Sequence, residues 1–151
     1  MSIFHGMNTS ASALTAQRLR MDIASSNIAN ANTTRATVNE NGQWEPYRRK
    51  MVVFEPQEKS FQSFLQSAAN RSSTPGQGVE VSAIVEDEEP FKQMYNPSHP
   101  DANEAGYVQL PNVDPLQEMV DIMSATRSYE ANVTSINATK GMLMKALEIG
   151  K

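Results

Sequence analysis

The sequence predicts a mainly α-helical protein with a small β-rich middle, in which long N- and C-terminal helices pair as a coiled coil. All eight prolines lie between Pro46 and Pro115, so both ends of the chain lack the residue that breaks a helix interior. Apolar residues recur at heptad spacing in both ends, and most aromatic residues lie between Trp44 and Tyr107. We therefore expect a helical domain that is discontinuous in sequence and a central β domain. The chain then consists of an N-terminal helical arm at 1–33, a β-rich region at 34–113, and a C-terminal helical arm at 114–151 that pairs with the first arm.

The N-terminal arm carries one narrow apolar seam. Met7, Leu14, Met21 and Ile28 recur every seven residues, which is the spacing of a helix that packs along a single line. Few charged residues interrupt the segment 8–31, so a helix there, about 36 Å long at 1.5 Å per residue, has almost no strongly solvated face. Such a helix is expected to be marginally stable in isolation.

Three asparagines, Asn27, Asn30 and Asn32, lie around the C-terminal end of this seam. One interpretation is a frayed helix end, where asparagine serves as a cap and turn residue. The other is that the side-chain amides form hydrogen bonds to neighbouring subunits across an interface of low charge. The sequence leaves both interpretations open.

The middle of the chain is expected to contain strands at 47–54, 78–85 and 91–95. In 78–85, apolar and polar residues alternate with the period of a half-buried strand. The basic cluster at 48–50 is expected to protect the start of the first strand. A variable loop or short helix is expected near 56–75. The acidic run at 86–89 lacks the spaced ligands and the turn glycine of a calcium loop, so we expect a solvated turn.

The C-terminal arm has a well-marked start. Asp114 is placed as the N-cap, Pro115 as the first helical residue and Gln117 as a capping-box residue. Two heptad series follow and predict a helix of about 35 residues. A layer of two helices covering the central sheet is the alternative, but helices this long favour arms that project beyond a compact core. The first series contains Met119, Thr126, Val133, Lys140 and Leu147, and the second contains Ile122, Tyr129, Ile136 and Leu143.

Composition excludes several functional classes. The formal net charge is −4, so the basic patch that gives proteins most of their affinity for nucleic acid is not expected. Cysteine is absent, which excludes disulfides and thiolate metal sites. The first thirty residues contain no apolar signal region, and no apolar run reaches the ~18 residues needed to cross a bilayer. We expect neither a cleaved signal peptide nor membrane insertion.

Catalytic groups are scarce. His5 and His99 are the two histidines, and although Ser98 and Asp101 lie near His99, a catalytic triad requires residues that converge from separate elements. No phosphate-binding loop, nucleophile elbow or zinc-binding helix motif is present. The sequence therefore predicts a protein that is not an enzyme, with no cofactor, no metal and no small-molecule substrate.

Four segments carry a family resemblance. Residues 24–33, ASSNIANANT, resemble the N-terminal signature of flagellar rod, hook and hook-associated proteins. The segments 46–54 and 95–113 resemble the proximal-rod proteins of this axial family, and 118–132 is similar to their C-terminal helix. The chain length agrees with a proximal-rod protein, because hook and distal-rod proteins carry larger central insertions.

This resemblance implies a structural subunit of the flagellar basal-body rod. Such a subunit would be secreted unfolded through the flagellar type III export apparatus and assembled in the periplasm, with copies of itself and other rod proteins, into the helical shaft that transmits motor torque. The alternative function is a soluble coiled-coil adaptor or export chaperone. The expected assembly interface consists of Met7, Leu14, Met21, Asn27, Ile28, Asn30, Met119, Ile122, Tyr129, Val133, Ile136, Leu143 and Leu147.

Overall fold

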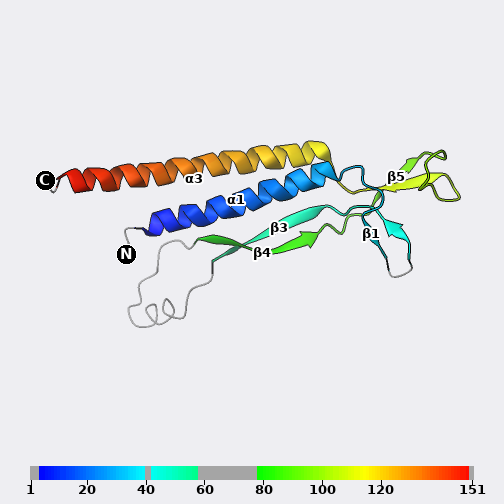
Figure 1. Cartoon of the computed structure of the whole chain (residues 1–151), viewed down its shortest axis with the longest axis horizontal. Coiled ribbons are helices and arrows are strands. Elements are labelled where there is room, and N and C mark those ends of the chain that lie inside the picture. Colours follow the sequence, from blue (N-terminus) through cyan, green and yellow to red (C-terminus); the bar gives the residue numbers. More distant parts are fainter. Residues whose placement is uncertain (1–3, 40–41, 58–77, 150–151) are drawn as a thin grey trace, which may run out of the picture. The chain divides into compact units, whose positions relative to one another are not determined.

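The computed structural model describes residues 4–39, 42–57 and 78–149. In these ranges two long helices flank six short strands in the chain order (Figure 1). The predicted fold class is confirmed in its main features, since the helices occupy the two ends and small antiparallel sheets occupy the middle. The elements are α1 (His5–Ala29), β1 (Thr37–Val38), β2 (Trp44–Glu45), β3 (Lys50–Pro56), β4 (Val79–Glu86), β5 (Lys92–Tyr95), β6 (Tyr107–Leu110) and α3 (Pro115–Ile149).

The ends of the two helices follow from local hydrogen bonding. At the start of α3, the Asp114 carboxylate accepts a hydrogen bond of 3.0 Å from the Leu116 N–H, as expected for an N-cap residue. α1 ends where the Ala31 N–H bonds the Ile28 carbonyl at 3.2 Å, a tighter turn than the helix itself. Neither helix in the described ranges combines the length and the apolar character that crossing a bilayer requires.

The strands form three separate two-stranded sheets, β1–β2, β3–β4 and β5–β6. In β5–β6, Lys92 lies opposite Leu110 and Tyr95 lies opposite Tyr107. The rings of these two tyrosines meet edge to face with centroids 5.3 Å apart, a favourable aromatic geometry. Gly106, at φ 80°, makes the turn into β6 because an L-residue rarely adopts that conformation.

The strand predicted at 47–54 is observed three residues later, as β3. The backbone N–H groups of Tyr47 and Arg49 are hydrogen-bonded elsewhere. The Tyr47 N–H donates to the Thr33 carbonyl at 3.1 Å, and the Arg49 N–H donates to the Asn112 side chain at 2.8 Å. These bonds replace ladder bonds, so the strand starts at Lys50.

Two further predictions concern the segments 78–85 and 56–75 in the middle of the chain. The period-two alternation of 78–85 predicts a half-buried strand, but this is wrong beyond the first residues of β4, since Ile84 and Val85 are exposed. A sheet of only two strands covers few of its own side chains, so alternation in the sequence does not guarantee their burial. The loop or short helix predicted near 56–75 falls mostly at residues 58–77, which lie outside the described residues.

The chain divides into two compact units, each composed of separate stretches. The first unit comprises the described residues of Met1–Leu19, Val53–Ala83 and Ala125–Lys151, and the second unit those of Arg20–Val52 and Ile84–Ser124. Each unit therefore contains part of α1, part of α3 and part of the β-rich middle. The coiled-coil seam between the two helices stays a prediction.

Most of the buried side chains belong to the second unit. Its apolar members include Tyr47, Val108 and Val113, and they are joined by buried polar residues. In the described part of the first unit, by contrast, the buried residues are small ones: Ser10, Ala16 and Ala125.

Candidate functional site

Asn27 lies near the end of α1 with only 1% of its surface exposed. Its side-chain NH₂ donates to the Lys50 carbonyl at 2.9 Å and to the Glu118 carboxylate at 3.0 Å. Its side-chain oxygen accepts from the Lys50 N–H and from the Tyr47 hydroxyl, both at 3.0 Å. All four hydrogen-bonding positions of the amide are therefore used. Because Lys50 presents both a donor and an acceptor, the backbone of β3 fixes which way the amide points.

Glu118, on the first turns of α3, is the second buried member, with a side chain 2% exposed. One carboxylate oxygen accepts from Arg49 Nε at 2.6 Å, and the other accepts the hydrogen bond from Asn27. A buried carboxylate is costly unless it is paired and hydrogen-bonded. Both conditions are met here. We call Asn27, Tyr47, Arg49, Lys50 and Glu118 the buried network.

Further charges surround Arg49. Its guanidinium lies 3.3 Å from the Asp87 carboxylate and 3.5 Å from that of Asp121, and Asp121 also pairs with Arg20 at 2.6 Å. Burial by itself lowers the pKa of Arg49, but the hydrogen bond and charge of Glu118, followed by those of Asp87, outweigh this and raise the pKa. The guanidinium is therefore held firmly in its charged form.

Asn112 extends these contacts to the acidic loop. Its side-chain oxygen accepts from the Arg49 N–H, and its NH₂ donates to the carbonyls of Asp87 and Glu89 at 3.3 and 3.2 Å. The sequence-based expectation of a solvated turn is wrong for Asp87, whose side chain is only 14% exposed and pairs with Arg49. It holds for Glu88 and Glu89, which are exposed. The segment is anchored by one acidic residue that sequence reasoning did not separate from its neighbours.

These contacts set the direction and the facing of the helices within the second unit. Arg20 pairs with Asp121, and Asn27, further along α1, bonds Glu118, earlier in α3. The two helical segments therefore run antiparallel.

The first turns of α3 are inverted relative to an ordinary amphipathic helix. Glu118 and Asp121 face the protein, where Asn27 and the two arginines bind them. The opposite face carries large apolar side chains at the spacing i, i+3, i+4, i+7, which defines one side of a helix. These residues form what we call the apolar stripe: Leu116, Met119, Val120 and Met123, exposed by 73%, 52%, 55% and 55%.

Among the predicted interface residues of α1, the heptad seam is half-buried throughout. Met7, Leu14, Met21 and Ile28 all have intermediate exposure. None of these four side chains is fully covered within the subunit.

The predicted interface residues of α3 divide into two groups. Ile122, Tyr129, Ile136 and Leu143, with Val133, have intermediate exposure, whereas Met119 and Leu147 are exposed. The heptad pattern identified Met119 but missed its neighbours on the apolar stripe. Their i, i+3, i+4, i+7 spacing was visible in the sequence and is the signal that could have found them.

The predicted asparagines have different surroundings. Asn27 is used entirely within the subunit, as described above, which neither sequence-based interpretation anticipated. Asn30 donates from its side chain to the Ser26 carbonyl at 3.0 Å and accepts from the Thr33 hydroxyl at 3.2 Å. These are the local contacts expected of a helix-end residue. Asn32 is exposed.

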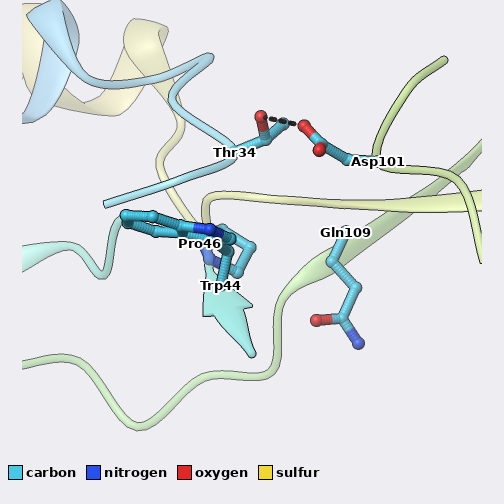
Figure 2. Close-up of a pocket in the computed structure, with 5 residues that line it drawn as sticks. All are labelled: Thr34, Trp44, Pro46, Asp101 and Gln109. Carbon is cyan, nitrogen blue, oxygen red and sulfur yellow. Dashed lines mark hydrogen bonds between the residues drawn. The ribbon is translucent and has the colours of Figure 1, made fainter. Parts of the chain in front are cut away.

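A shallow pocket of 180 Å³ lies in the second unit. In Figure 2, the hydroxyl of Thr34 bonds the Asp101 carboxylate, and Trp44, Pro46 and Gln109 complete the lining. Arg35 also pairs with Asp101. Hydrogen bonds from Arg35 and then Thr34 lower the pKa of Asp101, so this carboxylate is ionised and already paired.

His99 Nδ1 accepts a hydrogen bond of 3.1 Å from the Asp101 N–H, so the nearby histidine is used in a local turn. Within the described ranges, no group of three or more His, Asp or Glu side chains is placed to hold a metal ion.

Comparison with known proteins gives consistent matches at both ends and over the full chain. Residues 7–37 match the family described as "Flagella basal body rod protein", and residues 104–149 match "Flagellar basal body rod FlgEFG protein C-terminal". The chain is 63% identical to the flagellar basal-body rod protein FlgC of Bacillus subtilis (strain 168), with 100% of both chains covered. It is 41% identical to FlgC of Borreliella burgdorferi, covering 99% of this chain and 98% of the relative. It is 38% identical to FlgC of Salmonella typhimurium, with both chains covered completely.

Proposed function

The chain belongs to the FlgC family of flagellar basal-body rod proteins, and from this premise we propose that it is a proximal-rod subunit that self-assembles through its two terminal helices. A structural rod subunit located in the basal body is what the family membership itself supports. The finer points, which are the position in the proximal rod, the helical surfaces used and the route of export, form the proposal. A catalytic role is not part of it.

The observation that carries the proposal is the apolar stripe. Four large apolar side chains, each more than half exposed, lie together on one face of α3. Scattered exposed apolar residues are ordinary on a soluble protein, but a contiguous row marks an interaction surface. Glu118 and Asp121 are already bound on the opposite face, so the stripe is left for contact with another molecule.

The heptad seams supply the remaining surface. Residues of intermediate exposure, such as Leu14 and Ile136, bury more area when a neighbouring helix packs beside them. Near the end of α3, Leu147 is 77% exposed and extends this apolar character. The proposed interface comprises the predicted seam residues together with Leu116, Val120 and Met123. Asn27 contributes indirectly, because its amide holds the helices that carry these residues.

Repeated use of such a surface accounts for a shaft. When one face of a subunit docks on a different face of the next, the contacts continue as an open helix instead of closing into a ring. Helices packed along their length then resist twisting through many small side-chain contacts. In this arrangement the terminal helices carry motor torque.

The proposed route is export through the flagellar type III apparatus. Helical segments with little burial of their own unfold at low cost, and they regain order when they dock on other subunits. The sparse burial in the described part of the first unit supports this coupling of folding to assembly.

The test is a single charge placed on the apolar stripe. Val120→Glu adds a carboxylate where the proposal places a packed contact, so we expect rods to be missing from basal bodies and swimming to be lost. Ser98→Glu is the matched control, because Ser98 is also exposed, lies outside both helices, and receives the same added charge. We expect this control to retain assembly and motility.

Each variant would replace the native copy in a motile strain, with rods counted in electron micrographs of basal bodies. Purified Val120→Glu should keep the wild-type circular dichroism spectrum and unfolding midpoint, so that any loss is one of assembly. Complete rods in the Val120→Glu strain would overturn the proposed interface.

A further inference from the structure

The buried network joins segments that are far apart in the chain. Asn27 comes from α1, Lys50 begins β3, Tyr47 and Arg49 come from the stretch before it, and Glu118 comes from α3. Each buried group has its hydrogen bonds completed by a different segment. If one segment detaches, a charge or amide in the remaining segments stays buried without its hydrogen-bond partner. The network therefore forms as a whole.

In the described part of the first unit, the fully buried residues are small, Ser10, Ala16 and Ala125, and none of them is charged or an amide. A long hydrogen bond of 3.5 Å joins the hydroxyls of Ser10 in α1 and Ser135 in α3. Ser12 accepts a hydrogen bond of 3.1 Å from the Val79 N–H. The side-chain oxygen of Gln17 is buried and has no hydrogen-bond partner among the described residues. A buried acceptor without a donor makes the free energy of folding of this unit alone less favourable.

We propose that the buried network is a folding clamp that keeps residues 20–29 of α1 and 115–124 of α3 ordered in a single, unassembled subunit. Only residues 5–19 of α1 and 125–149 of α3 then become ordered when the subunit assembles. The boundary between the two behaviours falls inside each helix, although neither helix is interrupted there.

The clamp also determines which face of α3 is available. With Glu118 bound to Asn27 and Arg49, the carboxylate face is held toward the protein. The apolar stripe is therefore presented before any partner arrives. This consequence rests on the proposed function of the stripe, whereas the clamp itself is a property of the isolated chain. Preformed surfaces dock without the entropic cost of ordering, while the remaining helical segments acquire order afterwards.

Hydrogen exchange of the purified full-length chain tests the clamp, at a concentration where sedimentation shows monomers. In the wild type, amides of 20–29 and 115–124 should exchange about 100-fold more slowly than those of 5–19 and 125–149. Uniform exchange along each helix, whether fast or slow, would overturn the proposal.

Two variants of the network and one control sharpen the measurement. Asn27→Asp is nearly isosteric but replaces the NH₂ donor with an acceptor facing the Lys50 carbonyl and Glu118, so protection of 20–29 should be lost. Tyr47→Phe removes one donor and leaves the ring, so exchange of 20–29 should accelerate about 5- to 10-fold. Asn32→Asp makes the same chemical change at an exposed position and should leave the wild-type pattern intact.

Loss of protection in Asn27→Asp supports the clamp whether it stays within 20–29 or spreads through the second unit. Wild-type protection of 20–29 in both Asn27→Asp and Tyr47→Phe would contradict the clamp. These readouts come from monomers and do not depend on assembly, so the clamp and the proposed interface can fail separately.

Discussion

Two side-chain amides on α1 show how differently the two units are constructed. Asn27, in the second unit, uses all four of its hydrogen-bonding positions within the subunit. Gln17, ten residues earlier and in the first unit, has a buried oxygen without a partner among the described residues. Both residues belong to one continuous helix. The stability of a helical segment therefore depends on what it packs against, not on helix continuity alone.

The same contrast holds for apolar side chains. The second unit covers Tyr47, Val108 and Val113 almost completely. In the described part of the first unit, large apolar side chains such as Met142 and Leu147 remain exposed by 66% and 77%. The second unit thus has a core of its own and still exposes the apolar stripe, whereas the described part of the first unit buries only small residues and exposes its large apolar ones.

The largest effect is expected from Arg49→Met. This change leaves the Glu118 carboxylate buried without its cation, and breaking a buried pair in this way costs about 3–5 kcal/mol. Trp44 is the single tryptophan of the chain and belongs to the second unit. Urea unfolding followed by its fluorescence therefore reports this unit directly.

Arg18→Met removes an exposed cation from α1 as the control for Arg49→Met, and it should shift the free energy of unfolding by less than about 0.5 kcal/mol. The double variant Arg49→Met/Glu118→Gln should regain part of the lost stability, because no unpaired charge stays buried. Equal unfolding midpoints for Arg49→Met and wild type would refute the view that the network stabilises the second unit.

A pair of glycine substitutions should give effects of opposite sign in the two units. Gly106 has φ 80°, and an added Cβ would lie 2.9 Å from the Tyr95 ring, so Gly106→Ala should destabilise the second unit by about 1–3 kcal/mol. Gly141 lies in the first-unit part of α3 with no atom within 4 Å of an added Cβ. Gly141→Ala should stabilise the helix by about 0.5–1 kcal/mol.

The matched readouts are Trp44 fluorescence for Gly106→Ala and far-ultraviolet circular dichroism for Gly141→Ala. The helical signal of monomeric Gly141→Ala should rise while its Trp44 unfolding midpoint stays at the wild-type value. A midpoint that moved with the helical signal would show that the two units unfold together, and the contrast between them would not hold.

The smallest effect is a pH dependence located at Asp101. Its pKa in the folded protein lies below the ordinary value of 3.8 because Arg35 and Thr34 bind the ionised carboxylate. A depressed folded-state pKa contributes stability above the unfolded-state value, and this contribution is lost as the pH falls through the folded-state pKa. Asp101→Asn should therefore lower the unfolding midpoint slightly at pH 7.

As the pH falls through the depressed folded-state pKa of Asp101, the difference between Asp101→Asn and the wild type should shrink toward zero. Glu104→Gln, which neutralises an exposed carboxylate in the same loop, serves as the comparison. A difference for Asp101→Asn that stayed constant from pH 7 to pH 2 would rule out the carboxylate charge as its cause.

Much of the fold was predictable from local patterns. The Asp114-Pro115 start, the absence of proline from both ends and the heptad spacing predicted helices close to α1 and α3. The strand predictions were less accurate, because the residues before Lys50 form hydrogen bonds to Thr33 and Asn112, which are distant in sequence. A local pattern cannot represent a backbone that is hydrogen-bonded to residues elsewhere in the chain.

The candidate site was only partly predictable. Asn27 was identified as important, but its partners were not, since Tyr47, Lys50 and Glu118 lie 20, 23 and 91 residues away. Asp87 was grouped with a solvated acidic run for the same reason. Pairings of this kind depend on contacts that become visible only when the chain is folded.

The sequence by itself determined that both ends of the chain are long helices and where α3 begins, because proline placement and capping act over a few residues. It also determined that their surfaces carry little charge. Only the tertiary structure decided that α3 begins with Glu118 and Asp121 facing the protein and Leu116, Met119, Val120 and Met123 facing away. A periodic pattern identifies the apolar side of a helix, but it assigns that side to the interior by default. Here two arginines and one asparagine from other segments bind the opposite side and reverse the assignment.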